Sequence, residues 1–377
     1  MKRSTDRILT THTGSLPRPD DLVQMLYAQE KGEAQEHAAF LARIREATAE
    51  VVRQQVEVGI DIVNDGEVGK IGYATYVKDR LTGFDGEAGP LRSADVLAFP
   101  NFAKRVYRLS GVKRPACTGP ITYKDTAALQ QDLDNFKAAL HGVNPEEAFL
   151  SAASPGVISL FLKNDYYPNH DAYLTALADA MKVEYNAIHQ AGFLLQVDCP
   201  DLAMGKHIQF ADVSLADFRK NAELHIEALN HALSDIPPER IRLHLCWGNY
   251  EGPHHLDVPL RDIIDIVLKA RPAALSFEAA NPRHAHEWKV FHEFTLPPGK
   301  ILIPGVLDST TNYIEHPELV AERLCRFAEV VGKENVIAGT DCGFSTFAGL
   351  TEVDPQITWA KFRAMAEGAR IASAQLW

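Results

Sequence analysis

The sequence predicts an α/β protein, a (β/α)₈ barrel with insertions that roof the carboxyl-terminal face of its sheet. Short β-rich segments alternate with long amphipathic segments along the chain, which is the pattern of a parallel sheet covered by helices. Eight such β-rich segments can be recognised, the number that closes a barrel. Neither G-x-G-x-x-G nor G-x-x-x-x-G-K-[ST] occurs, so a doubly wound nucleotide-binding fold loses its main support.

The predicted strands extend from the start of the chain to residue 341. They comprise residues 8–14, 61–66, 115–121, 194–199, 241–247, 274–280, 301–307 and 336–341. Between the strands, apolar residues recur at three- and four-residue spacing, as in amphipathic helices. The predicted helices comprise residues 38–58, 173–190, 215–233, 260–270, 318–331 and 357–374. His316-Pro317 and Gly332 are a conventional start and stop for one of them.

Two stretches, residues 70–113 and 123–169, are longer than simple connections between a strand and a helix. We interpret both as insertions over the barrel mouth. Barrels with insertions commonly reach this length as one unit. Residues 1–377 are therefore predicted to form a single domain.

The amino-acid composition indicates which kinds of binding partner the protein has. Lys and Arg number 38 against 50 for Asp and Glu, a formal net charge of −12, which argues against nucleic acid or an anionic membrane and favours a small molecule. No run of 18 apolar residues occurs, and no apolar segment follows the basic N-terminal residues, so a cytoplasmic location is predicted. The five cysteines are too scattered for a disulfide scaffold. Assembly into a homo-oligomer is left open.

Four residues with ligand-type side chains lie at the carboxyl ends of the fifth, sixth and eighth predicted strands. His244 and Cys246 are two residues apart on one strand, so their side chains point to the same side. Glu278 ends the next strand, and Cys342 follows the last one. Barrel active sites are built at this face, so we predict that the four converge on one metal ion. Singly, each has a structural alternative, such as a packed thiol or a hydrogen-bonded core histidine.

This donor set suits Zn²⁺, which binds thiolate, imidazole and carboxylate ligands. Two thiolates and a carboxylate would outweigh the two positive charges of the metal, so the site would be poor at generating hydroxide. It would be better suited to holding a substrate thiol as a nucleophilic thiolate. We expect Glu278, the hardest ligand, to be displaced by the incoming sulfur.

The same segments resemble the catalytic C-terminal domain of the cobalamin-independent methionine synthase family, over nearly the whole chain. The matching segments are TGSLPR at 13–18, DGE at 65–67, LQVD at 195–198, HLC at 244–246, Glu278 and DCG at 341–343. They are similar to the family's G-S-F/L-P, D/H-G-E and I-Q-I-D segments and to its zinc-ligand segments. The resemblance implies a zinc-dependent transferase that methylates the thiol of homocysteine.

By the same resemblance, Ser15, Glu67 and Asp198 bind the amino-acid end of homocysteine. Two carboxylates at strand ends suit its ammonium group, although either could instead fix a loop. Tyr73 and Tyr76 are further candidates for the substrate pocket. A tyrosine pair at near-helical spacing is, however, more often simply packed.

The sequence departs from the family at the residues that handle the methyl donor. The family's D-I-H segment, whose histidine protonates the departing folate nitrogen, corresponds to residues 308–310, which read Asp-Ser-Thr. No tryptophan stands at residues 154–157, where the family stacks the pterin. Candidates for a general acid are then Asp308, Asp198 and His12, besides the two tyrosines. The alkyl donor, whether folate, another methyl donor or an epoxide, stays open.

Two alternative functions remain open at this stage. An epoxyalkane:coenzyme M transferase, which resembles this family, would use a sulfonate thiol to open an epoxide. The candidate cations for that sulfonate are Arg18, Lys70, Lys78 and Arg80. A metal-free enzyme of the uroporphyrinogen decarboxylase type would use a similar barrel without zinc.

A second group of histidines offers a rival metal cluster. It comprises His254, His255, His284, His286 and His292. His254 and His255 follow the fifth predicted strand, close to the barrel mouth. His284 and His286 are expected near a helix start, exposed to solvent.

Overall fold

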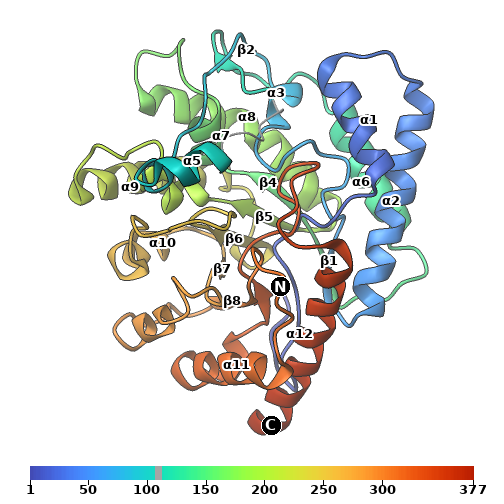
Figure 1. Ribbon diagram of the computed structural model, residues 1–377, viewed down its shortest axis with the longest axis vertical. Coiled ribbons are helices and arrows are strands. Elements are labelled where there is room, and N and C mark those ends of the chain that lie inside the picture. Colours follow the sequence, from blue (N-terminus) through green and yellow to red (C-terminus); the bar gives the residue numbers. More distant parts are fainter. Residues whose placement is uncertain (107–112) are drawn as a thin grey trace.

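The computed structural model describes residues 1–106 and 113–377, and helices surround a curled sheet at its centre (Figure 1). Seven parallel strands pair in the order β1-β4-β5-β6-β7-β8-β9. Their bounds are β1 Ile62–Asn64, β4 Glu147–Ala153, β5 Leu194–Asp198, β6 Ile241–Leu245, β7 Ala274–Phe277, β8 Ile301–Leu307 and β9 Gly339–Thr340. Most of their residues are apolar and buried, as a parallel sheet with both faces covered requires.

Residues around Thr10 close the ring of strands. Thr10 forms a parallel bridge with Ala338, beside β9. Its carbonyl oxygen accepts hydrogen bonds from the backbone N–H groups of Asp61 and Ile62, at 3.2 and 3.0 Å. The segment predicted as the first strand therefore lies between β9 and β1 as the eighth member of the ring. The barrel predicted from the sequence is confirmed.

The prediction of the third barrel strand was wrong. Residues 115–121 contain β3 (Ala116–Cys117), which pairs antiparallel with β2 (Phe84–Asp85) in a separate two-stranded sheet. The barrel strand is β4, which pairs with β1 and β5 and lies in a stretch interpreted as an insertion. Pro120 could not donate to a central ladder, whereas the alanine-rich sequence of β4 gives little β-propensity to recognise.

Helices cover the outside of the ring (Figure 1). Their bounds are α1 Asp20–Lys31, α2 His37–Glu57, α3 Val77–Arg80, α4 Ala94–Leu97, α5 Pro100–Val106, α6 Ala127–Ala139, α7 Pro155–Phe161, α8 His170–Gln190, α9 Leu215–Ala232, α10 Ile264–Val267, α11 Pro317–Val331 and α12 Pro355–Leu376. Side chains of Asn169, Ser214 and Asp354 cap the starts of α8, α9 and α12. No helix in the described residues is both long and apolar enough to cross a membrane.

Five of the six predicted helices correspond to α2, α8, α9, α11 and α12. Residues 260–270 instead form a 3₁₀ turn, η4 (Leu260–Asp262), followed by the short α10. The following Pro272 disfavours helical backbone at the residue before it. Helices α1 and α6, which the sequence analysis did not predict, flank α2 (Figure 1).

A buried arginine inside the barrel holds the segment around Thr10 that closes the ring of strands. Arg242, in β6, is fully buried and donates to Thr11 Oγ1 at 2.9 Å and to the carbonyl oxygen of His12 at 2.7 Å. Its guanidinium carbon lies 4.0 Å from the centroid of the Phe149 ring, a cation–π contact. Because side chains alternate along a strand, Arg242 and His244 both face the barrel interior.

A buried ion pair anchors α12, and its removal tests this account of the fold. Lys361 Nζ lies 2.9 Å from Glu315 Oε2, with side chains 0% and 7% exposed. Lys361→Met leaves a buried carboxylate without its partner, so the free energy of unfolding is expected to fall by about 3–5 kcal/mol. Urea denaturation of the purified protein measures this change.

Two controls accompany this measurement. Arg370→Met removes an exposed pair with Glu367 from the same helix and is expected to leave the unfolding free energy nearly unchanged. The double variant Lys361→Met, Glu315→Gln is expected to recover most of the loss, because no buried charge remains. A loss in Lys361→Met no greater than that in Arg370→Met would contradict the assignment.

Candidate metal centre and active site

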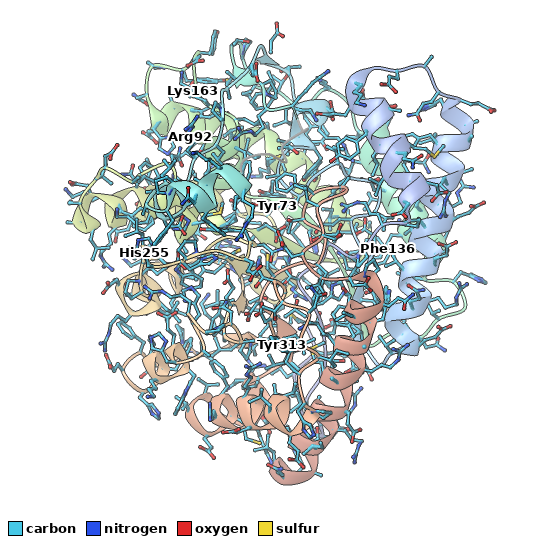
Figure 2. The ribbon with its side chains drawn as sticks, viewed as in Figure 1. Tyr73, Arg92, Phe136, Lys163, His255 and Tyr313 are labelled. Carbon is cyan, nitrogen blue, oxygen red and sulfur yellow. The ribbon has the colours of Figure 1, made fainter. Side chains whose placement is uncertain are left out.

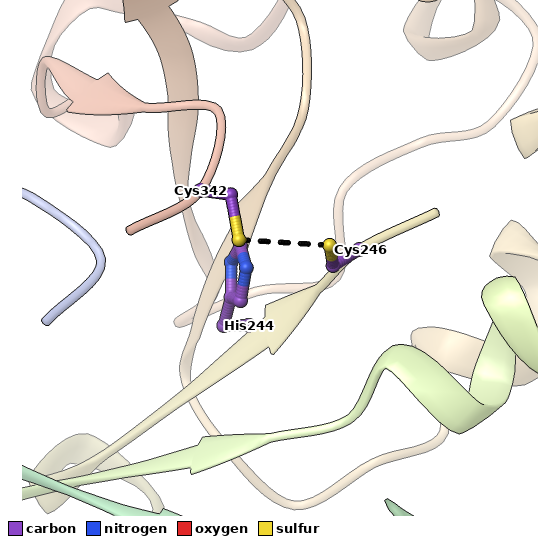
Figure 3. A group of neighbouring side chains, drawn as sticks. All are labelled: His244, Cys246 and Cys342. Carbon is purple, nitrogen blue, oxygen red and sulfur yellow. Dashed lines mark hydrogen bonds between the residues drawn. The ribbon is translucent and has the colours of Figure 1, made fainter. Parts of the chain in front are cut away.

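Three of the four predicted metal ligands meet at the carboxyl end of the barrel (Figure 3). His244 is in β6, Cys246 follows the end of that strand, and Cys342 follows β9. One ligand atom from each lies within 4.8 Å of the others, and all three residues are buried. The two sulfurs are 3.7 Å apart. The strand alternation and the parallel order of β6 and β9 therefore produce the predicted convergence.

The chemistry of this group fits a soft metal ion such as Zn²⁺. Neither ring nitrogen of His244 has a hydrogen-bond partner in the described structure, although the side chain is buried. Burial, with the nearby charge of Arg242, lowers the pKa of His244 to about 3, so the imidazole is neutral and can donate a nitrogen lone pair. Such an unsatisfied buried group costs stability unless something binds it.

Glu278 lies beside this group without being part of it. Its Oε1 accepts a hydrogen bond from the backbone N–H of Trp247 at 2.7 Å, and its Oε2 accepts one from Asn281 Nδ2 at 2.8 Å. Burial and the neighbouring Cys246 sulfur raise the pKa of this carboxyl well above its usual range. A role for Glu278 as fourth ligand thus remains a prediction, with the carboxylate held next to the cysteines.

A cavity of about 570 Å³ opens above the three residues. Its polar lining residues include Thr13, Ser15, Glu67 and Asp198, beside His244, Cys246 and Cys342. Its other walls are largely apolar and include Tyr73, Phe161, Phe347, Met204 and Val96. Tyr73 lies near the middle of the molecule in Figure 2, and its ring packs edge-on against Phe161 and Phe347, with centroids 5.7 Å away in each case.

Two carboxylates, Glu67 and Asp198, predicted as substrate contacts, both line this cavity. Glu67 is 2% exposed and its Oε2 has no hydrogen-bond partner among the described residues. Its backbone has a positive φ of 53°, which is uncommon for a residue other than glycine. Burial and the charge of Glu67 raise the pKa of Asp198 well above its usual range. A cationic ligand bound near both carboxylates would offset the desolvation of their charges and the repulsion between them.

The loop that carries Glu67 is held by Arg18. The Arg18 guanidinium is buried and donates to the carbonyl oxygens of Glu67 and Lys70 at 2.9 and 3.0 Å, and to that of Ser345 at 2.6 Å. Ser15, another predicted substrate contact, packs against Gly343, where a Cβ atom would lie 2.0 Å from the serine Oγ. A side chain at Gly343 would therefore force the Ser15 hydroxyl to move.

The structure does not bring three predicted site residues into the cavity. The Nε2–H of His12 donates to Gln55 at 2.8 Å, and its Nδ1 accepts from the N–H of Gly14 at 3.1 Å, so both ring nitrogens are used in the core. Tyr76 donates to Glu184. The Asp308 carboxylate accepts from the backbone N–H and the hydroxyl of Thr310, both at 2.8 Å. All three side chains are buried and have local structural roles.

Other residues that line the cavity were not predicted from the sequence. They are Arg105, Asn249, Tyr250, Phe102 and Phe161. Arg105 and Phe102 belong to α5, inside the stretch 70–113 that was predicted to roof the barrel, but no motif marked them individually. The four cations considered for a sulfonate do not line the cavity in the described structure; Arg80, for example, pairs with Asp132 at 2.6 Å.

Comparisons with known proteins agree with this architecture. Residues 8–96 and 157–369 match the family described as cobalamin-independent synthase, catalytic domain. A methionine synthase from Thermococcus kodakarensis is 26% identical over 368 residues, covering 97% of this chain and 94% of its own. One from Pyrococcus furiosus is 24% identical, covering 96% of this chain and 91% of its own.

Solved structures show the same fold. A B12-independent methionine synthase from Shewanella sp. W3-18-1, in complex with selenomethionine, superposes with a TM-score of 0.76 at 19% identity, covering 98% of this chain and 99% of its own. A putative vitamin-B12-independent methionine synthase from Listeria monocytogenes gives a TM-score of 0.66 at 16% identity, with the same coverage of both chains. Because the family match spans most of the sequence, the chain belongs to the cobalamin-independent synthase family and is a transferase.

Proposed function

We propose that this protein transfers a methyl group to the thiol of homocysteine, using Zn²⁺ held by His244, Cys246 and Cys342. Glu278 is the proposed fourth ligand. The observation that carries the proposal is that one cavity combines a nitrogen and two sulfurs fit for zinc with a pair of carboxylates fit for an ammonium group. The names of the curated relatives support the same substrate.

When bound, zinc would act as a Lewis acid that lowers the pKa of a thiol, as it does for other ligands. The residues of the chain supply the rest of the site. His244 is neutral and the two cysteines are buried, so the donor set is electron-rich and leaves a substrate sulfur nucleophilic. The hydrogen bonds from Trp247 and Asn281 hold the Glu278 carboxylate near Cys246.

Glu67 and Asp198 are proposed to receive the ammonium group of homocysteine. A single positive charge between them would compensate the burial of both carboxylates, and it would fix which end of the substrate points toward the cysteines. Ser15 also lines the cavity and can donate its hydroxyl to the substrate carboxylate. Selenomethionine in the Shewanella relative is an amino acid of the same shape as the product.

The apolar wall formed by Tyr73, Phe161 and Phe347 restricts water around the substrate sulfur. A thiolate that is poorly solvated is a stronger nucleophile. In the transfer, a sulfur–carbon bond forms while the bond between the methyl carbon and the donor breaks, and the donor keeps the electron pair. The thiol proton passes to solvent beforehand and the departing donor takes one up, so the reaction is balanced without any oxidant or reductant.

The alternatives from the sequence are not favoured. The family match points to methyl transfer rather than to epoxide opening or decarboxylation. Of the cations suggested for a sulfonate, Arg18 is committed to backbone carbonyls and Lys78 pairs with Glu30 at 2.9 Å. Asp308 and His12 are not retained as general acids, because their polar atoms are already engaged.

The zinc site is tested by replacing its sulfurs. Cys246→Ser and Cys342→Ser are each expected to lower zinc affinity by at least ~100-fold, because a hydroxyl is a far poorer zinc ligand than a thiolate. Zinc X-ray absorption of the purified variants, compared with the native protein, measures the loss of zinc–sulfur scattering. Cys325→Ser, which changes a half-buried thiol on α11, should leave the spectrum unchanged. Unaltered zinc–sulfur scattering in both test variants would refute the site.

The ammonium contact is tested by Glu67→Gln. Loss of a charged hydrogen bond of about 1.5–3 kcal/mol predicts a rise of roughly 10- to 100-fold in the Kd for homocysteine, measured by calorimetry without any methyl donor. The Kd for 4-mercaptobutanoic acid, which lacks the amino group, is expected to stay within about twofold. Glu352→Gln, at a carboxylate elsewhere on the cavity wall, serves as the matched control. Equal effects on the two thiols would rule out this contact.

A further inference from the structure

The two cysteine sulfurs of the candidate metal centre have the spacing of zinc ligands. Cys246 Sγ and Cys342 Sγ are 3.7 Å apart (Figure 3). Two thiolates bound at about 2.3 Å to one tetrahedral zinc ion are separated by about 3.8 Å. The cysteines are 96 residues apart in the sequence and lie in the loops after β6 and β9. The contacts between these two loops therefore decide whether both sulfurs can bind one ion.

The side chain of Asn249 joins the two loops. Its Nδ2 donates to the carbonyl oxygen of Gly343, the residue after Cys342, at 2.7 Å. Apart from the contact between the two sulfurs, this is the one hydrogen bond in the described structure between residues 244–250 and residues 340–346. Asn249 is thus the direct connection between the segments that carry the two cysteines.

Other anchors of the Cys342 loop connect it to different parts of the barrel. The N–H of Phe344 donates to the carbonyl oxygen of Ser15 at 2.8 Å. Thr340 Oγ1 donates to the carbonyl oxygen of Cys342 at 2.9 Å, within the same loop. These contacts do not reach the Cys246 loop, so the distance between the sulfurs depends on the Asn249 amide.

Both ends of this amide are used, which fixes its orientation. The Gly343 carbonyl is only an acceptor, so the NH₂ group of Asn249 must face it. The Oδ1 atom then accepts from the hydroxyl of Ser309 at 2.8 Å. Ser309 is buried in the loop after β8, which the Asp308 carboxylate holds through Thr310. Two hydrogen bonds through one amide thus connect the loops after β6, β8 and β9.

A short turn connects Asn249 to Cys246. Gly248 has a positive φ of 121°, a conformation that glycine adopts without steric cost. Its N–H donates to Cys246 Sγ at 3.2 Å. Cys246, Gly248 and Asn249 all line the cavity. Because the ligand sulfur and the bridging amide belong to one turn, the position of each depends on the other.

The loop after β6 is also anchored by a buried network. Trp247 Nε1 donates to the carbonyl oxygen of Val258 at 2.7 Å, and its ring stacks on that of His284, with centroids 4.1 Å apart. His284 lies 3.0 Å from Asp257 Oδ2 and 2.8 Å from Glu287 Oε2. Contrary to the expectation from the sequence, His284 is therefore buried. The network gives the turn that carries Asn249 a fixed base.

We infer that Asn249 is a positioning residue for the zinc centre: it sets the distance between Cys246 and Cys342 and thereby the affinity for the metal. The inference rests on the proposed function, since it concerns the same zinc ion. Removal of outer hydrogen-bond partners typically lowers metal affinity by about 10- to 100-fold. The amide acts on the backbone next to Cys342, so its loss loosens the site without removing a ligand.

The first test is the zinc affinity of full-length Asn249→Ala, measured by competition with a chromophoric chelator. The Kd for zinc is expected to rise by about 10- to 100-fold, because the two loops can separate. X-ray absorption at saturating zinc is expected to show two sulfur neighbours still, since both cysteines remain. Asn312→Ala is the matched control: Asn312 also joins backbone segments, at Glu352 and Asp354, and a Kd within about twofold of the native value is expected.

A second variant tests the connection through Ser309. Ser309→Ala retains the bond from Asn249 to Gly343 but frees the amide oxygen, so a smaller rise in the zinc Kd, about two- to fivefold, is expected. Because Ser309 acts through Asn249, the double variant Asn249→Ala, Ser309→Ala is expected to bind zinc as Asn249→Ala does. Two independent structural defects would instead add in the double variant.

The inference is overturned if Asn249→Ala, with native circular dichroism, binds zinc within about twofold of the native Kd. It is also overturned if Asn312→Ala shows the same loss of affinity, or if the two substitutions are additive. Should Asn249→Ala not fold, an unchanged Kd in Ser309→Ala has the same meaning. In these cases zinc–sulfur scattering in the native protein leaves the proposed function standing, whereas its absence there overturns both.

Discussion

The Asp341 carboxylate connects the elements on which the proposed zinc centre depends. Its two oxygens accept backbone hydrogen bonds from Ala279, Ala280 and Asn281, at 2.7–2.8 Å, and so tie the loop that carries Glu278 to the residue before Cys342. The neighbouring Gly305, in β8, leaves room for this, because a Cβ atom there would lie 2.1 Å from Asp341 Oδ1. Burial, with the charge of Asp308, raises the pKa of this carboxyl to about 6. One buried side chain thus links the segment after β7 to the end of β9.

The cavity lining combines acidic and sulfur-containing side chains with a larger apolar surface. Glu67, Asp198 and the two cysteines belong to this lining. Their negative charge attracts cations, whether a metal ion or an ammonium group. Tyr73, Phe161 and Phe347 give another part of the lining an apolar surface.

The features of the structure that depend on local periodicity could be predicted from the sequence. The two-residue spacing of His244 and Cys246 predicts their common orientation, and the strand order brings Cys342 to them. The sequence analysis missed β4, whose small residues are selected by tight packing rather than by β-propensity. It also placed His12 near the chemistry, because a histidine at a strand end has no pattern that reveals its core partner Gln55. Clusters such as Asp95 with His254 join residues about 160 positions apart, and only tertiary structure can reveal them.

The contact of Thr10 with Ala338 has a consequence for how the molecule is made. One edge of the ring is contributed by the segment around Thr10, and its partner strand lies more than 300 residues further along the chain. Loop closure over such a distance is slow relative to local pairing. During translation the growing sheet must therefore persist as an open arc with unpaired strand edges. Cys342 emerges only after Ala338, so the proposed thiol-activating centre can assemble only once the whole ring is available.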